Sequence, residues 1–189
     1  YRMDERKWIE RILAGDTQSF SCLVAKYEKM AYTIALRILE NREEAEEAVQ
    51  DAFVKMYRAL SDFHFDSKFS TWFYRIVYRT ALTALRQQRM IVSYEEAGPV
   101  DLSNDEVESA TALLEREDRK EMIARTLKKL PADEALLLTL YYLEECSVEE
   151  ICQITELSAS NVKVKLFRGR KRFYEVLQDK MKLETADLL

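Results

Sequence analysis

The sequence of 189 residues is poor in the two residues that shape turns, with three glycines and two prolines. This scarcity argues against a turn-rich β fold and favours long helices with short connections. Apolar residues make up 48% and charged residues 33%, which excludes a disordered chain. No apolar run is long enough to cross a membrane and no charged-then-apolar leader opens the chain, so we expect a cytoplasmic protein.

Residues that commonly carry catalysis or bind metals are also scarce. His64 is the only histidine, and no serine, cysteine or carboxylate pattern completes a catalytic triad or dyad with it. Cys22, Cys146 and Cys152 have neither metal-ligand spacing nor an even number. We expect buried thiols in a reducing compartment, and a redox role stays open. Since a glycine-rich phosphate loop is also missing, we expect no enzyme, no cofactor and no metal site.

The net charge of −5 argues at first against a nucleic-acid partner, but the charges are segregated along the chain. Residues 40–51 carry six acidic side chains and one arginine. Residues 67–94 contain five basic side chains and residues 157–174 contain six, and neither stretch contains an acid. Two basic blocks in an acidic chain indicate two separate contacts with polyanions.

Apolar residues recur three and four positions apart over most of the chain, which predicts amphipathic helices and no strands. We expect a short helix at about 4–14 and three long helices capped by Asp16, by Asn41 with Glu44, and by Ser70. Tyr57 lies on the apolar stripe of the long helix that Asn41 caps, so we expect it to be buried. Together the four helices predict a bundle.

Residues 92–112 interrupt the helical pattern. Their acidic character and a Gly98-Pro99 pair predict an extended linker. The chain is therefore expected to be all-α, with a first domain at 1–91 and a second at 113–189. In the second domain we expect four helices: at about 113–130, from Pro131 onward, at 147–154 and from 159 to about 180. On the helix that begins at Pro131, we expect Leu143 to be buried.

The end of the second domain has the strongest local pattern. Ser147 with Glu150 forms a capping box, and apolar residues after it have the spacing of two short helices packed across a turn. This pattern predicts a helix-turn-helix, whose second helix enters the major groove. About six neutralised phosphates would give a log–log salt slope of about −5. The residues expected to contact DNA are Ser158, Ser160, Asn161, Lys163, Lys165, Arg168, Lys171 and Arg172.

A second basic segment begins at Lys68 and interleaves cations with aromatic residues. Arg75, Arg79 and Arg86 share one helical face, and Trp72, Tyr74 and Tyr78 alternate with them. Cations can follow a backbone while aromatic faces stack on bases, as in single-strand binding. The alternative, a core role for the aromatics, holds in part for Trp72 and Phe73. The expected contacts are Lys68, Phe69, Ser70, Thr71, Trp72, Arg75, Tyr78, Arg79 and Arg86.

The acidic helix has an outward face formed by Glu47, Gln50, Asp51, Val54 and Arg58. From the residues alone, a solvated face and a protein-binding face are equally good interpretations.

In this order, the segments resemble the extracytoplasmic-function (ECF) group of bacterial sigma factors over almost the whole chain. The run Phe69-Ser-Thr-Trp-Phe-Tyr-Arg-Ile is close to the group's most recognisable motif, and Glu46-Glu-Ala-Val-Gln-Asp-Ala-Phe resembles its polymerase-binding helix. Ser147-Val-Glu-Glu-Ile, with Asn161-Val-Lys and Arg168-Gly-Arg, resembles its promoter-reading helix-turn-helix. The turn position that the group commonly fills with glycine is Glu156.

The resemblance implies a factor that gives core RNA polymerase its promoter specificity and helps to open promoter DNA. It implies that the acidic helix docks on the polymerase clamp helices. The loop at 62–68 and the helix from Phe69 would hold the melted minus-ten strand with one base flipped out. The helix at 159–172 would read the minus-thirty-five duplex, and the linker would thread the polymerase channel. It further implies an anti-sigma protein, often membrane-anchored, and no small-molecule substrate.

Two other functions remain open at this point. One is a conventional helix-turn-helix regulator with a sensor or dimerisation domain, and the other is a helical adaptor that binds only protein. The basic-aromatic segment argues against a sensor, because a sensor has no use for a strand-binding helix. An adaptor would show no salt-dependent affinity for DNA.

Overall fold

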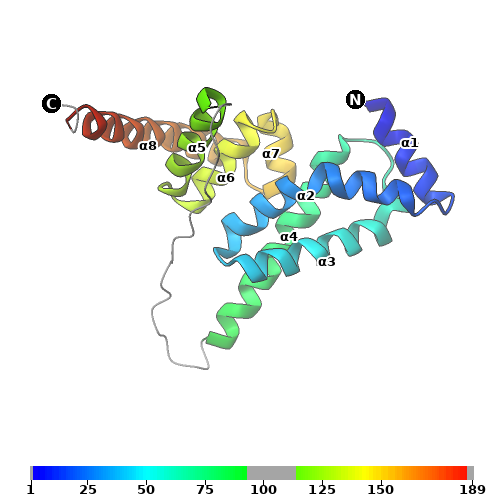
Figure 1. The fold of residues 1–189 in the computed structure, drawn as a ribbon. Coiled ribbons are helices and arrows are strands. Elements are labelled where there is room, and N and C mark those ends of the chain that lie inside the picture. The colour runs from blue at the N-terminus through cyan, green and yellow to red at the C-terminus, as the bar shows by residue number, and fades with distance from the viewer. Residues whose placement is uncertain (1, 93–113, 187–189) are drawn as a thin grey trace.

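A computed structural model describes residues 2–92 and 114–186, and every element in these two stretches is a helix (Figure 1). The all-α prediction is therefore confirmed for the described chain. Almost the whole of the predicted acidic linker, from residue 93 onward, lies outside the described residues.

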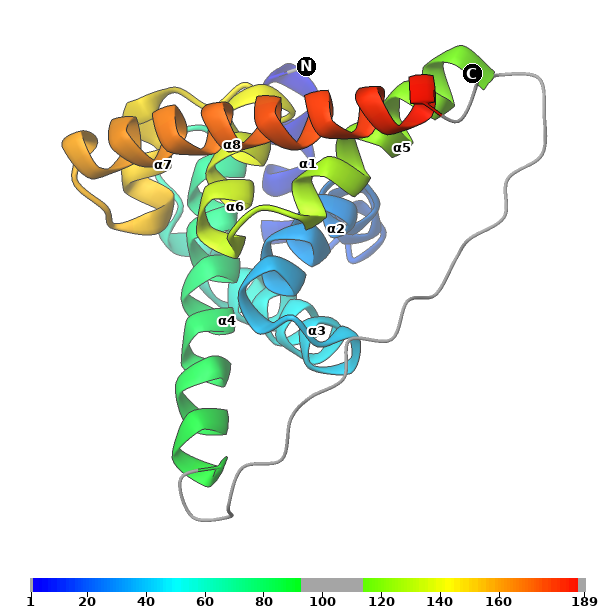
Figure 2. The same ribbon diagram turned by 90° about the vertical axis from the view of Figure 1, so that its left-hand side faces the viewer.

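The first domain contains four helices and a single turn of 3₁₀ helix. The elements are α1 (Arg2–Leu13), α2 (Gln18–Leu39), α3 (Arg42–Ala59), η1 (Leu60–Asp62) and α4 (Phe69–Val92). The long α2 packs against α1, α3 and α4, as the apolar stripes predict. The C-terminal half of α4 projects beyond the other helices in both views (Figures 1 and 2).

One of the three predicted caps of the first domain is confirmed, because the Asn41 side chain accepts the N–H of Glu44 at 3.2 Å. The prediction for Asp16 is wrong by one residue: the N-cap of α2 is Thr17, which makes no side-chain cap hydrogen bond, although the Asp16 carboxylate accepts the backbone N–H of Gln18 at 3.0 Å. The prediction for Ser70 is wrong, because α4 already begins at Phe69 and Ser70 lies inside its first turn.

The core of the first domain is rich in aromatic rings. Phe53 lies 4.8 Å from Phe73 between ring centroids, and Tyr27 lies 5.3 Å from Phe69. Tyr57 does not join this core, and our prediction for it is wrong: it is 47% exposed, with its ring edge against Phe20. It occupies the margin of the α3 stripe, where no further helix covers it.

The second domain consists of α5 (Leu114–Lys128), α6 (Ala132–Tyr142), α7 (Val148–Thr155) and α8 (Ala159–Ala186). Pro131 occupies the N-cap of α6, as expected. Leu143, predicted to be buried, is 57% exposed because α6 ends one residue before it and the chain turns away. Helix α8 is longer than predicted, and Figure 2 shows it spanning the second domain.

The two domains contact each other directly. Helix α7 packs along α4, and α6 packs against α2 (Figure 1). The Arg37 guanidinium adds a hydrogen bond of 3.3 Å to the backbone oxygen of Leu127. These contacts join residues about ninety positions apart, so they define an arrangement that no local pattern could predict.

The cysteines differ in exposure. Cys146 is buried and Cys152 is half-buried, but Cys22 is exposed, which corrects our expectation of three buried thiols. Among the residues with described side chains, no group of three His, Cys, Asp or Glu residues is placed to hold a metal ion. No helix within 2–92 or 114–186 has the length and apolar character needed to span a membrane.

Candidate nucleic-acid and protein interfaces

Helices α7 and α8 form the predicted helix-turn-helix. The Ser147 hydroxyl accepts the N–H of Glu150 at 3.2 Å, and the Glu150 carboxylate accepts the N–H of Ser147 at 2.9 Å, so the capping box is complete. The Ser158 hydroxyl accepts the N–H of Asn161 at 3.3 Å and begins α8. The side chains that pack the two helices together are Ile151, Ile154, Val162 and Leu166, all buried.

The turn between these helices contains a strained residue. Glu156 has φ of 62°, a left-handed conformation that favours glycine, and its N–H donates to the Cys152 oxygen at 2.8 Å. The side chain of Glu156 leaves the turn and reaches the first domain, as described below.

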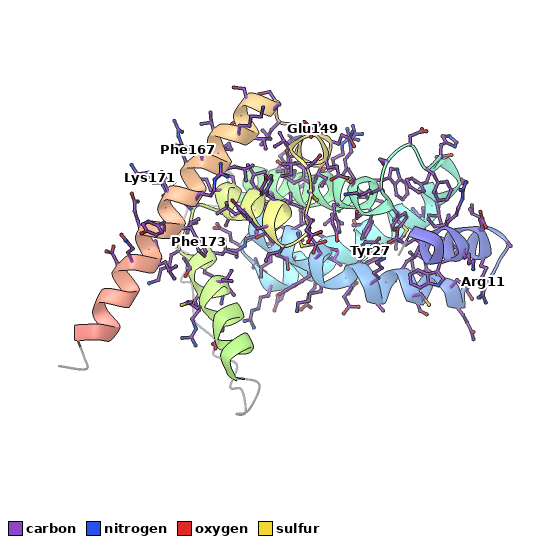
Figure 3. All side chains as sticks on the ribbon, turned by 90° about the horizontal axis from the view of Figure 1, so that it is seen from above. Arg11, Tyr27, Glu149, Phe167, Lys171 and Phe173 are labelled. Carbon is purple, nitrogen blue, oxygen red and sulfur yellow. The ribbon has the colours of Figure 1, made fainter. Side chains whose placement is uncertain are left out.

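The outer face of α8 is polar and cationic. Its exposed side chains are Ser158, Ser160, Asn161, Lys163, Arg168 and Lys171. Lys163 and Arg168 have no carboxylate partner within the described chain, and Lys171 has one at 4.0 Å, on its own helix. Figure 3 shows Lys171 and Phe167 on the side of α8 away from the other helices, whereas Phe173 points toward them. This face is therefore open to a polyanion.

Two cations predicted for this face instead turn toward α6. Lys165 pairs with Asp133, and Arg172 donates to Glu134 at 3.1 Å. Burial raises the pKa of Asp133, but the Lys165 hydrogen bond and two backbone N–H groups outweigh it and hold that pKa below its usual range. The expectation that Lys165 and Arg172 contact DNA is corrected for this arrangement, because both fasten α8 to α6.

Helix α3 presents the predicted acidic face. Glu47, Gln50, Asp51, Val54 and Arg58 are all exposed, because the buried side of α3 faces α2 and α4. Beside this face lies an apolar hollow of about 350 Å³, lined by Thr17, Phe20, Phe53, Val54, Tyr57 and Arg58. The face thus combines negative charge with an apolar recess.

The cationic face of α4 meets acidic side chains of the second domain. Lys68 lies 2.9 Å from Glu150, and the Arg79 Nε donates to Glu156 at 2.8 Å, while Arg75 approaches the same carboxylate at 3.4 Å. The hydrogen bond from Arg79 is the largest cause that lowers the pKa of Glu156. Two arginines predicted to follow a DNA strand are therefore held by one carboxylate of their own chain.

Neutral groups of α4 join the same contact. The Thr71 hydroxyl lies 3.5 Å from Glu150, and the Tyr74 hydroxyl donates to Glu144 at 2.8 Å. Burial and the nearby Glu144 charge raise the pKa of Tyr74, so its hydroxyl stays protonated as a donor.

Comparison with known proteins finds two family models along the chain. Residues 23–90 match the family model of sigma-70 region 2, and residues 120–173 match that of sigma-70 region 4. The RNA polymerase sigma-H factor of Pseudomonas aeruginosa is 32% identical over 181 residues, which cover 92% of this chain and 94% of that protein. The chain belongs to the sigma-70 family. It is a sigma factor of the ECF group, as the resemblance predicted.

Further similarities agree with this assignment. The ECF RNA polymerase sigma-E factor of Escherichia coli K12 is 29% identical over 177 residues, 90% of this chain and 92% of that one. The fold resembles the structure of RpoE in complex with the anti-sigma factor NepR from Bartonella quintana (TM-score 0.68, 18% identity, 86% and 98% coverage). It also resembles CnrH in complex with the cytosolic domain of CnrY (TM-score 0.61, 21% identity, 93% and 98% coverage).

The burial of α4 corrects part of the predicted minus-ten set of this sigma factor. Phe69 is 3% exposed, because its ring packs into the aromatic core and cannot stack on a base. Tyr74, which is not in that set but alternates with its arginines, is buried in the same core at 2%. Thr71 is 2% exposed where α4 meets α7. Ser70, Trp72 and Tyr78 are half-buried, whereas Lys68, Arg75, Arg79 and Arg86 are exposed.

Some surface residues of the sigma factor were missed by sequence reasoning. On the outer face of α8, Val164 is 45% and Phe167 is 65% exposed, although both are apolar. The only sign of their exposure in the sequence is that they do not share the helical face of the buried residues Val162 and Leu166. Phe65, in the loop before α4, has φ of 61° and carries the Arg6 guanidinium 4.7 Å from its ring centre. A positive φ at a phenylalanine has no signature in the sequence.

Proposed function

We propose that this sigma factor divides its work among three surfaces: α3 binds core RNA polymerase, α4 holds the melted minus-ten strand, and α8 reads the minus-thirty-five duplex. The observation that carries the proposal is the open cationic row on α8, the second helix of a complete helix-turn-helix. In a chain with net charge −5, such a row has no role in packing and fits the phosphate backbone.

On α8, the chemistry of each group suggests its role at the duplex. Lys163, Arg168 and Lys171 are placed to neutralise phosphates, and Ser160 and Asn161, near the helix N-terminus, can hydrogen-bond to base edges. Val164 and Phe167 offer exposed apolar surface between these polar groups. Apolar side chains in the major groove contact thymine methyl groups, so we assign these two residues to thymine recognition.

On α4, the exposed arginines Arg75, Arg79 and Arg86 can follow the backbone of a single strand. Trp72 and Tyr78 keep part of their rings accessible for stacking, and Lys68 and Ser70 lie at the helix start beside the loop at 62–68. This proposal leaves out the buried rings of Phe69 and Tyr74, whose role is to hold α4 in place.

On α3, an acidic face would be repelled by DNA, so a protein partner fits it better. Glu47 and Asp51 supply charge for basic side chains of the polymerase clamp, and the hollow beside Val54 can receive an apolar side chain. Since RpoE of Bartonella quintana, whose fold is similar, forms a complex with an anti-sigma factor, we also infer that an anti-sigma protein controls this chain. The protein would act in the cytoplasm beside polymerase, without catalysing a reaction itself.

Transcription in vitro with purified core polymerase on a genomic DNA library tests this function. We expect the chain to select start sites that core enzyme alone does not use. A variant with Lys163→Ala and Arg168→Ala should lose this selection while it still binds core enzyme. If the wild-type chain selects no start site yet binds duplex DNA without polymerase, the protein is instead a conventional helix-turn-helix regulator.

A further inference from the structure

The side chain at the turn of the helix-turn-helix is the starting observation. Glu156 occupies a left-handed position where glycine is favoured, so its backbone gains nothing from being glutamate. Its carboxylate instead reaches Arg79 and Arg75 on α4. The residue is therefore explained by its contact across the domains and not by the turn.

Two further carboxylates lie on the same side of the second domain. Glu150 contacts Lys68 and Thr71, and Glu144 accepts the Tyr74 hydroxyl. Glu150 and Glu156, which we call the acidic edge, hold three cations at the start of α4, from Lys68 to Arg79, whereas Glu144 holds only the neutral Tyr74. A melted DNA strand would present phosphates to the same cations in the same order.

We infer that the acidic edge (Glu150 and Glu156) is an internal competitor for the minus-ten strand, so that α4 of the free chain is closed to DNA until the domains part. This inference rests on the proposed assignment of α4 to that strand. The competition is one-sided, because the outer face of α8 stays exposed in the closed chain. In the free chain the duplex-reading face of α8 is therefore accessible, whereas the strand-binding face of α4 is covered.

The strength of these ion pairs depends on how far their side chains are exposed to solvent. Lys68, Arg75 and Arg79 keep about half of their side-chain surface in water, so solvent and salt screen these ion pairs. These ion pairs are thus weak enough for a partner that binds either domain to break them. The apparent affinity of α4 for a strand falls by the fraction of molecules that are open.

Closure can be measured by small-angle X-ray scattering of the full chain. Glu156→Gly removes the carboxylate and relaxes the strained turn, so we expect a larger radius of gyration. Glu145→Gly is the matched control: Glu145 also has a positive φ (52°) and is exposed, but it has no ion pair or hydrogen bond to the first domain. We expect this control to scatter like the wild type.

Exchanging the charges at positions 156 and 79 tests whether the chain expands because this specific contact is lost or because the substitutions destabilise the fold. Glu156→Arg alone and Arg79→Glu alone should each enlarge the chain, because each places like charges together. The double variant restores opposite charges at the same two positions and should return the compact dimensions. Failure of the double variant to restore them overturns the contact.

Competition is measured with a fluorescent oligodeoxythymidine strand and the full chain. We expect Glu156→Gly to bind it about three- to tenfold more tightly than the wild type and Glu145→Gly to bind as the wild type does. Equal affinity and equal scattering of all three proteins overturn the inference. An enlarged Glu156→Gly chain that binds no strand also overturns competition, and it shows that the assignment of α4 failed while closure did not.

Discussion

Arg172 of α8 donates a hydrogen bond of 3.1 Å to Glu134 of α6, whose side chain is only 7% exposed. The second carboxylate oxygen of Glu134 is buried and has no partner within the described chain. Arg172 is thus the counter-ion of a buried charge, although it lies in the basic block that the sequence assigned to DNA. Its first role in the free protein is to hold α8 against α6.

We expect Arg172→Ala to lower the free energy of unfolding by about 2 kcal/mol, because it leaves the Glu134 carboxylate buried without its counter-ion. Urea denaturation of the full chain measures this loss. The neighbouring Lys171 is exposed, and its pair with Glu175 is on the surface, so Lys171→Ala should change stability by less than about 0.5 kcal/mol. Equal stability of both variants would refute a structural role for Arg172.

The cysteines give a second prediction, on reactivity. Burial, with the nearby charges of Glu150 and Glu144, raises the pKa of the Cys146 thiol to about 12. At pH 8 only about one such thiol in ten thousand is ionised, and the thiolate is the reactive form. Mass spectrometry after brief treatment with iodoacetamide should therefore find Cys22 alkylated and Cys146 intact until urea is added. Alkylation of both at similar rates would contradict the buried position of Cys146.

The helices and their caps could be predicted because both depend on residues close in sequence. A stripe with a period near 3.6 defines each buried face, and Ser147 and Glu150 define a cap within four residues. Tyr57 and Leu143 were predicted wrongly for different reasons. Tyr57 lies at the margin of its stripe, where only the position of a neighbouring helix decides whether the ring is covered, and Leu143 lies just beyond the end of α6, which the stripe does not mark.

The pairing of the candidate surfaces could not be predicted from sequence. Arg79 and Glu156 are 77 residues apart and lie in different domains, so no periodicity links them. The two acid-free blocks indicated open cationic helices, but an acid-free segment says nothing about carboxylates elsewhere in the chain. In the structure those carboxylates engage Lys68, Arg75, Arg79, Lys165 and Arg172, while Lys163, Arg168 and Arg86 form no ion pair within 4.0 Å in the described part of the chain.

A third prediction follows for the salt dependence of duplex binding. Because Lys165 and Arg172 are held by α6, four of the six cations stay available, and we expect a log–log slope of about −3.6 for the full chain, in place of the −5 or so estimated from six cations. Lys163→Ala and Arg168→Ala should each flatten the slope by about one unit. Lys165→Ala is the control and should change it by less than about half a unit. Fluorescence anisotropy with a labelled duplex over a series of salt concentrations measures the slope, and an equal effect of all three variants would contradict this division of roles.

The last prediction concerns the acidic face of α3. Glu47→Lys and Asp51→Lys each reverse a charge on an exposed surface, so we expect binding to core polymerase to weaken about tenfold or more without loss of stability. Binding to a minus-thirty-five duplex should stay unchanged, because α8 lies in the other domain. Glu28→Lys makes the same charge change on the exposed side of α2 and should leave both affinities as they are. Fluorescence polarisation with labelled protein measures core binding, and an anisotropy titration measures duplex binding. A parallel loss of both affinities in Glu47→Lys would mean that the substitution disturbs the fold and that α3 has no specific part in docking.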